Sequence, residues 1–286
     1  MLESCRKEIK DTADGDNAGL LLARYLVAQE TSDKVKRGKL FDRACGATAK
    51  AKSVYEKAFD RWRETLEKSA VANRNNLMRE FTVDGRLIIG LGGENILETG
   101  LTLHHTYGVP YIPGAALKGL CAHYAHSLGG DFAKESAFHR AVFGDPTSAG
   151  RVQFHDAWID PESAPNCLVD DVMTPHHSKY YSGEAAPTDF DSPVPVTFLA
   201  VTGKFLVVLT CDDTDTKRRE NWIKAVWELL GAALKETGIG GKTNSGYGYG
   251  QLRGLSKDKK AKTETPALPA APTNWLAAKL AESKKK

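Results

Sequence analysis

Two glycine-marked segments, far apart in the sequence, carry the residues best suited to bind an anion. The first reads Tyr111-Ile-Pro-Gly-Ala-Ala-Leu-Lys-Gly119 and opens an apolar helical run. Proline and glycine at a helix start leave backbone N–H groups available, and the helix dipole favours anions there. The backbone of Gly114, Ala115 and Ala116, together with the Lys118 ammonium, is therefore expected to contact phosphate. The alternative for Lys118 is an ordinary solvated lysine.

The second segment runs from Gly238 to Gly250 and has six glycines in thirteen residues. Glycine at that density lets the backbone adopt positive φ and lie close to a ligand or to another part of the chain. Its donors Lys242, Thr243, Asn244 and Ser245 suit contacts with phosphates and ribose hydroxyls. The alternative is a structural loop that packs on the first helix. If the two segments met in space, they would suit a phosphate backbone.

The second segment also mimics part of a nucleotide-binding motif. Gly241, Lys242 and Thr243 match the end of a P-loop, which needs another glycine five residues before Gly241. That position is Glu236, inside a predicted helix. NTP hydrolysis is therefore not expected.

Two adjacent histidines, His176 and His177, raise the question of catalysis. A histidine with a lysine such as Lys179 can cut RNA without metal, by activating a 2′-hydroxyl and protonating the leaving oxygen. Loop histidines are more often scaffolding or RNA contacts, and we predict RNA contacts and no catalytic residue. The neighbouring Tyr180 and Tyr181 are suited to stack on bases or to brace a neighbouring subunit.

Scattered aspartates offer carboxylates for a divalent ion, but no metal site is expected. Asp156 shares a face of an alternating run with Val152, Phe154 and Trp158, which predicts a buried, hydrogen-bonded structural group. The other candidates are interpreted as turn-starting loop residues; they are Asp170, Asp171, Asp189 and Asp191.

Composition limits the class of protein. The chain has 286 residues, 41% of them hydrophobic, which suffices for a buried core. Its net charge is +3, but residues 255–286 alone contribute +5, so the body is slightly acidic. This excludes a uniformly basic nucleic-acid binder and favours a local patch completed by neighbouring subunits.

Cellular location and redox state are also constrained. The five cysteines are scattered, with no C-x-x-C pair, which indicates reduced thiols. No run approaches the roughly 18 apolar residues of a membrane span, and no signal-peptide pattern opens the chain. We expect a cytoplasmic protein.

Hydrophobic periodicity predicts an α+β fold. After residue 80 the predicted order is β, α, β, β, α, β, which is the ferredoxin-like or RNA-recognition-motif arrangement. An N-terminal helical addition and extra inserted helices complete it. The expected units are a helical region at 1–78, a core domain at 79–254 with a long loop at 159–195, and a flexible lysine-rich tail at 255–286. The expected helices are 17–30, 39–70, 115–128, 132–143 and 221–236, and the expected strands are 81–91, 151–158, 196–200, 205–210 and 247–252, with a hairpin at 202–203.

Several segments, taken in order, resemble a known family. They are Arg86-Leu-Ile-Ile-Gly90, Leu97-Glu-Thr-Gly100, Tyr107 to Gly119, Val172-Met-Thr-Pro-His-His177, Pro187-Thr-Asp189 and the closing glycine-rich segment. Together they resemble the RAMP superfamily of CRISPR-associated proteins and, more narrowly, the sixth-subunit family of the type III-B Cmr effector complexes. The resemblance runs from about residue 17 to residue 253.

The resemblance implies a modified RNA-recognition-motif fold and a non-catalytic role without a cofactor. It further implies a subunit at one end of a helical ribonucleoprotein that binds the 3′ part of the guide RNA and caps the backbone filament. The implied partners are guide RNA, target RNA, the RAMP backbone subunits and the small helical subunit. One departure is Ala115 and Ala116, where many relatives have hydroxyl residues. Two alternatives stay open: a metal-independent guide-processing endoribonuclease centred on His176 or His177, and a purely structural cap.

Overall fold

The N-terminal part of the chain is helical. Helix α2 (Ala18–Arg24) starts at Asn17, whose side-chain oxygen accepts a hydrogen bond from Leu20 N at 3.0 Å. Helix α3 (Lys34–Ser69) has 36 residues. Both predicted helices are confirmed where the structure describes them. The computed structural model describes residues 17–24, 34–69, 77–93, 97, 99–174, 177–191, 193 and 195–255.

An antiparallel sheet forms the centre of the molecule, in the order β10-β1-β9-β6-β2, with β5 also paired to β9. Its order matches the predicted ferredoxin-like arrangement, because the first and third strands of the motif lie side by side and the last strand flanks the first. The strands are β1 (Met78–Val83), β2 (Tyr111–Ile112), β5 (Val152–Phe154), β6 (Ala157–Ile159), β9 (Lys204–Cys211) and β10 (Gly250–Gly254).

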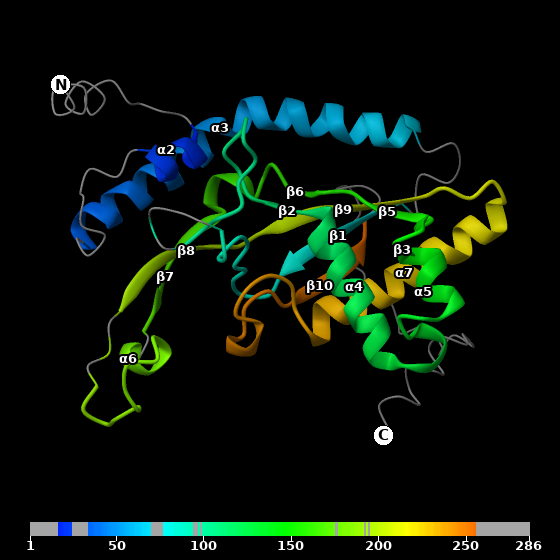
Figure 1. Cartoon of the computed structure of the whole chain (residues 1–286). Helices are drawn as coiled ribbons and strands as arrows, with labels where there is room; N and C mark the ends of the chain where they lie inside the picture. The colour runs from blue at the N-terminus through cyan, green and yellow to red at the C-terminus, as the bar shows by residue number, and fades with distance from the viewer. Residues whose placement is uncertain are drawn as a thin grey trace, which may run out of the picture.

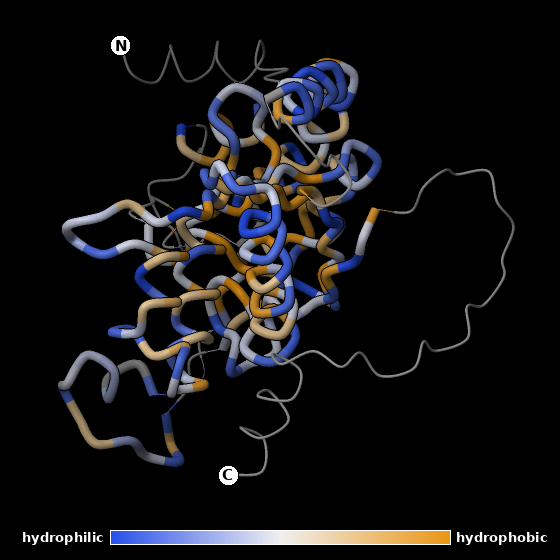
Figure 2. The backbone as a smooth tube through the Cα atoms, turned by 90° about the vertical axis from the view of Figure 1, so that its right-hand side faces the viewer, coloured by the Kyte–Doolittle hydropathy of each residue, from blue (hydrophilic) through white to orange (hydrophobic). Residues whose placement is uncertain are grey.

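Helices cover both faces of this sheet (Figure 1). Helices α4 (Gly114–Leu128) and α7 (Thr216–Glu236) contact each other on one face, and the indole of Trp227 is fully buried beneath α7. Helix α3 crosses the other face. There the Tyr55 hydroxyl donates to Ile159 O at 2.6 Å, and the ring of Trp62 stacks on Trp158 with centroids 4.9 Å apart. Hydrophobic segments gather at the centre of the molecule in Figure 2.

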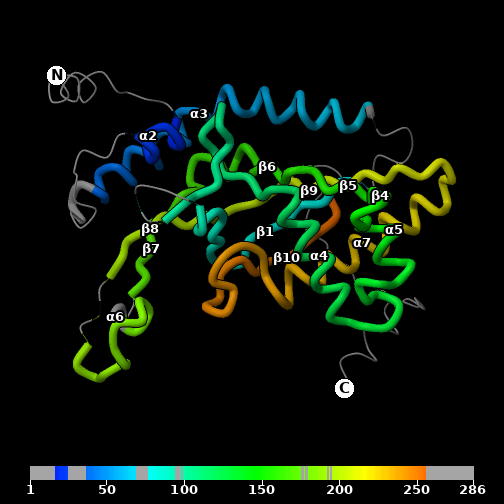
Figure 3. The backbone as a smooth tube through the Cα atoms, in the orientation of Figure 1, coloured from blue at the N-terminus to red at the C-terminus, as the bar shows by residue number. Residues whose placement is uncertain are grey.

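A separate hairpin projects from the body. Strands β7 (Leu168–Met173) and β8 (Val196–Val201) pair with each other, and the short helix α6 (Ser178–Tyr181) lies beyond them, away from the main sheet (Figure 3). A small core of Ile88, Phe198 and Ala200 lies at its base. This β7–β8 hairpin corrects two predictions. Residues 168–173 are strand and not loop, and β8 pairs with β7 and not with β9, because Gly203 at φ 118° turns the chain from one sheet into the other.

Element boundaries differ from prediction where local turns override the pattern. Strand β1 ends at Val83 and not near Gly92, because Gly85 (φ 80°) and Gly90 (φ 84°) turn the chain. Helix α5 (Ala137–Phe143) starts later than predicted, since the Ser136 hydroxyl accepts from His139 N. The remaining elements are η2 (Gly130–Phe132), β3 (Gly144–Asp145), β4 (Ser148–Ala149), η3 (Ala164–Asn166) and η4 (Thr243–Ser245). None of the helices within the described ranges is long and apolar enough to cross a bilayer.

Candidate functional site

The first candidate site, residues 113–118, is here called the α4 segment. Pro113 precedes α4 and its carbonyl accepts hydrogen bonds from Ala116 N and Leu117 N. Gly114 N donates to the Asp156 carboxylate at 2.7 Å. A Cβ at Gly114 would overlap the Phe154 carbonyl, so only glycine fits. The N-terminus of α4 is therefore already occupied by an anion, the carboxylate of Asp156.

A β-bulge brings Asp156 to this helix end. Phe154 pairs with Leu209 and Trp158 pairs with Leu206, so three residues on one strand oppose two on β9. Such an extra residue re-aims the side chains that follow it. The predicted strand at 151–158 is therefore split, and the prediction that Asp156 is buried is wrong, because this hydrogen-bonded side chain is exposed.

Aromatic side chains lie beside Asp156. The His104 ring is half-buried, with its centroid 5.0 Å from Trp158 and 4.7 Å from Tyr107. Burial lowers the pKa of His104, and the Asp156 carboxylate opposes this only in part. His104 therefore faces packed rings, whereas the neighbouring His105 is exposed. Sequence alone left the orientation of both histidines undecided.

The second candidate site, residues 238–250, is here called the glycine loop. Gly241 N donates to Ile88 O and Gly248 N donates to Arg86 O, both at 2.8 Å. Gly240 has φ 90°, and a Cβ there would overlap the Ile88 carbonyl. The loop thus packs on the segment that follows β1, and not on the first helix. Its glycines serve this close approach to the protein's own backbone.

The tip of the glycine loop carries the polar residues predicted from sequence. Lys242, Asn244 and Ser245 are exposed, and Thr243 is half-buried. Lys242 adopts a left-handed conformation with φ 59°, which is uncommon for a residue with a side chain. A row of hydrogen-bond donors therefore faces solvent, while the hydrogen bonds to Arg86 and Ile88 hold the backbone of the loop in place.

Contacts within the structure place the two segments against different neighbours. The end of α7, which leads into the glycine loop, meets α4 in the second half of that helix, where the Tyr124 hydroxyl donates to Glu236 at 2.8 Å. The start of α4 lies instead against Phe154 and Asp156. The expectation that the two segments meet gains no support from these contacts.

A three-residue network joins the glycine loop to the β7–β8 hairpin. Asp171 on β7 accepts from the Tyr247 hydroxyl at 2.7 Å and pairs with the Arg86 guanidinium at 2.6 Å. Burial raises the pKa of Asp171, but the hydrogen bonds from Arg86 and Tyr247 outweigh it and leave the pKa below its usual range. Asp170 and Asp171 lie in a strand, so their interpretation as turn-starting loop residues was wrong.

The predicted histidine site lies at the far end of this hairpin. His177 Nδ1 is 2.8 Å from Asp191 Oδ2, and the Thr188 hydroxyl also donates to Asp191. His176 lies outside the described residues. Three aromatic side chains near these groups are exposed, namely Tyr180, Tyr181 and Phe190.

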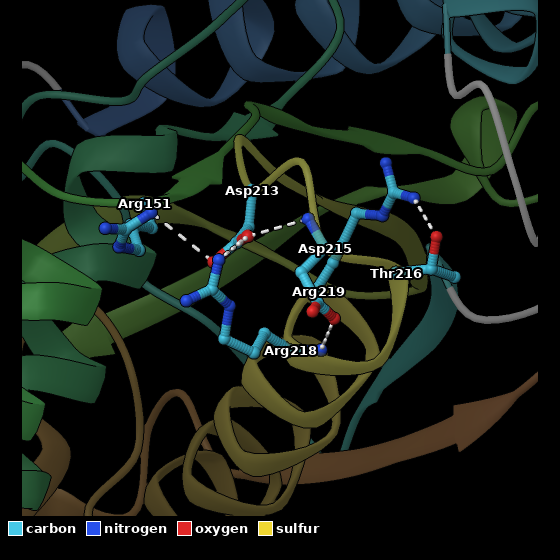
Figure 4. Close-up of polar contacts among 6 residues, drawn as sticks. All are labelled: Arg151, Asp213, Asp215, Thr216, Arg218 and Arg219. Atoms are coloured by element: carbon cyan, nitrogen blue, oxygen red, sulfur yellow. Dashed lines mark hydrogen bonds and ion pairs between the residues drawn. The ribbon is translucent and has the colours of Figure 1, made fainter.

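A second polar cluster was not predicted. The side chain of Asp213 is only 2% exposed and contacts the guanidinium groups of Arg151 and Arg218, each at 3.3 Å (Figure 4). The backbone N–H of Asp215 and then the two arginines hold the pKa of Asp213 below its usual range. These bonds tie the start of α7 to the sheet, which is a structural role. Arg218 and Asp215 are near Asp213 in sequence, but Arg151 is 62 residues away, so its contact with Asp213 depends on the fold.

Metal ligation finds no support in the described part of the chain, where no three His, Cys, Asp or Glu side chains cluster closely enough to hold an ion.

Comparison with known proteins agrees with the fold. A model of the RAMP superfamily matches residues 80–251. The CRISPR system Cmr subunit Cmr6 of Pyrococcus furiosus is 28% identical over 257 residues, covering 70% of this chain and 73% of the relative. Its counterpart in Saccharolobus solfataricus is 29% identical over 182 residues, covering 60% and 56%.

A solved structure gives the same fold. A chain of the type III-B Cmr-beta complex bound to cognate target RNA matches with a TM-score of 0.55 and 22% identity, covering 77% of this chain and 73% of that chain. The family model spans more than half of the present sequence. The chain therefore belongs to the RAMP superfamily, and within it is similar to the Cmr6 subunits.

Proposed function

We propose that this protein is a non-catalytic RNA-binding and assembly subunit of a type III-B Cmr effector complex in the cytoplasm. In this role it binds the 3′ part of a guide RNA and caps the filament of backbone subunits in antiviral defence. Its partners are guide RNA, target RNA, the RAMP backbone subunits and the small helical subunit. The named relatives are Cmr6 subunits, and the matched complex is bound to target RNA.

One observation carries the RNA-binding part of the proposal. The donor row from Lys242 to Ser245 projects from a loop whose backbone is held by Ile88 and Arg86. A pre-positioned row of donors binds phosphate and ribose without reading base identity. Binding is therefore sequence-independent and weakens as salt rises.

The capping part of the proposal rests on the β7–β8 hairpin. Tyr180, Tyr181 and Phe190 are exposed at its tip, Phe190 by 97%. Aromatic side chains gathered at one exposed place suit burial against another protein. In this proposal the hairpin tip grips a neighbouring subunit while the glycine loop holds RNA. We also propose that the chain is divided into a helical region (1–78), a RAMP domain (79–254) and a C-terminal tail (255–286).

Affinity purification from the native host tests the whole proposal. The tagged protein is isolated in gentle salt, its bound RNA is sequenced and its bound proteins are identified. The expected result is a set of CRISPR-derived guides together with related RAMP subunits. Unprocessed repeat transcripts without those subunits favour the endoribonuclease. The absence of guide RNA contradicts the proposal.

The site assignment has its own test. In the purified complex, the Lys118→Gln and Lys242→Gln pair is expected to lower guide retention while the melting temperature stays unchanged. Unchanged retention contradicts the assignment of the α4 segment and the glycine loop as the RNA contacts.

A metal-independent endoribonuclease is the second candidate, favoured by the contact between His177 and Asp191. A carboxylate on one ring nitrogen orients an imidazole for proton transfer at the other. This candidate requires RNA cleavage in excess chelator that disappears in His177→Ala. Persistent cleavage in that variant excludes His177 as the base.

A further inference from the structure

Helix α3 carries a regular row of basic residues that neither the glycine loop nor the hairpin accounts for. Their spacing is four or seven residues throughout. At about 100° per residue, all six fall within roughly 40° of one another around the helix axis. They extend over about 44 Å of helix at 1.5 Å per residue. We call them the α3 basic stripe: Lys39, Arg43, Lys50, Lys57, Arg61 and Lys68.

Packing of the opposite face of α3 turns this stripe outward. Phe41, Ala44, Tyr55 and Phe59 are buried against the body of the protein. Five of the six stripe residues are exposed and Arg43 is half-buried. In Figure 2, α3 lies at the edge of the molecule, with hydrophilic residues along much of its coil.

Acidic residues on α3 lie mainly to one side of the stripe. Asp42, Glu56, Asp60 and Glu67 are displaced from its centre by about 80–120° around the axis. Glu64 lies at the edge of the stripe and pairs with Lys68 at 3.3 Å. The uncharged residues beside the stripe include Gly46, Ser53 and Val54, and the side chain of Val54 is 63% exposed.

We propose that the α3 basic stripe binds the phosphate backbone of a single RNA strand. Its length and regular spacing match a linear polyanion better than a compact anion. Four of its six members are lysines, a residue type depleted from protein–protein interfaces and widely used for phosphate contacts. Because α3 covers the sheet face opposite α4 and α7, this site is separate from the α4 segment. The identity of the strand as guide RNA rests on the proposed function.

A matched pair of charge changes on the same helix tests the proposal. The stripe variant is Lys57→Gln with Arg61→Gln. Its control is Lys52→Gln with Arg63→Gln, which removes the same charge from another face, where Lys52 pairs with Glu162 and Arg63 with Glu67. The full-length protein is titrated with a labelled single-stranded RNA of about twenty uridines over a range of salt. The lysine-rich tail is common to all variants and cancels in the comparison.

The stripe variant is expected to reduce the slope of log affinity against log salt by about 1.4, at roughly 0.7 per lost single-strand phosphate contact. The control is expected to keep the wild-type slope. Equal loss in both variants means general charge attraction and overturns the proposal. If neither variant changes the slope but Lys242→Gln does, the stripe is wrong and the proposed function stands.

Two further outcomes identify what has failed. If the stripe variant binds RNA normally but loses its partner subunits on purification, the occupant is an acidic protein and the RNA proposal is wrong. If the wild-type protein and all variants fail to bind RNA at any salt concentration, the stripe is contradicted, whereas the proposed function is decided by the affinity purification of the native complex. Circular dichroism confirms that each variant keeps its helix content.

Discussion

The α4 segment and the glycine loop look alike in sequence but differ in what already occupies them. Each is marked by glycine, adjoins a helix end and carries one lysine. At the α4 segment, the Asp156 carboxylate takes the backbone donor of Gly114. In the glycine loop, Gly241 N and Gly248 N bind the protein's own carbonyls, but Lys242, Asn244 and Ser245 stay exposed. Exposed side-chain donors, more than glycine content, distinguish a free site from an occupied one.

This difference assigns separate roles to the two segments. A carboxylate at a helix N-terminus satisfies the dipole and repels a second anion. The α4 segment is thus a partly neutralised site, whereas the glycine loop combines a fixed backbone with a positive tip. We expect the glycine loop to contribute more to RNA binding.

The largest expected effect concerns the fixed backbone of the glycine loop. Gly240 and Gly246 both have φ 90°, but an added Cβ overlaps the Ile88 carbonyl at Gly240 and meets open space at Gly246. Gly240→Ala is expected to lower the free energy of unfolding by on the order of 3 kcal/mol, from strain and overpacking together. Gly246→Ala is expected to cost about 1 kcal/mol, from the backbone conformation alone. Urea denaturation measures both, and equal losses would contradict the packing described for the loop.

The next largest effect is a difference between Lys242 and Lys118 in the salt dependence of RNA binding. Lys242→Gln is expected to reduce the salt dependence of single-stranded RNA binding by about 0.7, the value for one phosphate contact. Lys118→Gln is expected to change it less, because Asp156 already places a negative charge at the start of α4. Fluorescence anisotropy with one RNA at several salt concentrations gives both slopes. A larger change for Lys118→Gln would reverse the comparison.

A smaller effect follows from neutralising Asp156. Asn at this position keeps an oxygen acceptor for Gly114 N and removes the negative charge. Asp156→Asn is expected to tighten RNA binding by about two- to fivefold, corresponding to roughly 0.3–1 kcal/mol at a helix terminus. The same titration measures the affinity. Asp212→Asn is the control of equal charge change, because Asp212 is exposed and lies just before the start of α7, whose other end leads into the glycine loop. Weaker binding in Asp156→Asn alone would mean that the carboxylate itself contacts the RNA.

The smallest effect is a pH dependence at Asp171. Its pKa in the folded protein is below the ordinary value, because the bonds from Arg86 and Tyr247 outweigh burial. A lowered folded pKa adds stability above the unfolded value of about 4, and this stability is lost as pH falls through the folded pKa. Asp171→Asn is therefore expected to flatten the fall in unfolding free energy below about pH 4. Parallel wild-type and variant curves would contradict the assignment.

Amphipathic periodicity made the larger elements predictable. Helices α3, α4 and α7 bury one apolar face each, which the spacing of their hydrophobic residues indicates. Strand β7 was missed because Asp170 and Asp171 interrupt its apolar pattern. The wrong hairpin at 202–203 has a different cause, since consecutive strands usually pair and here belong to different sheets.

Only the hydrogen-bond donors of the candidate site were predictable from the sequence. Glycine, lysine and small polar residues identified both segments from residue type alone. The acceptor at the α4 segment comes from Asp156, 42 residues away from Gly114, through a one-residue bulge that no local pattern reports. The bonds of Arg86 and Tyr247 to Asp171 are likewise long-range and depend on the fold being formed.

Ultraviolet crosslinking of the natively purified complex, followed by mass spectrometry of RNA-linked peptides, locates the residues of this subunit that contact guide RNA. Crosslinks are expected between guide RNA and the glycine loop, concentrated at residues 242–245, with fewer at residues 113–118. Guide RNA crosslinked elsewhere on this subunit, with the glycine loop unmodified, would contradict this expectation.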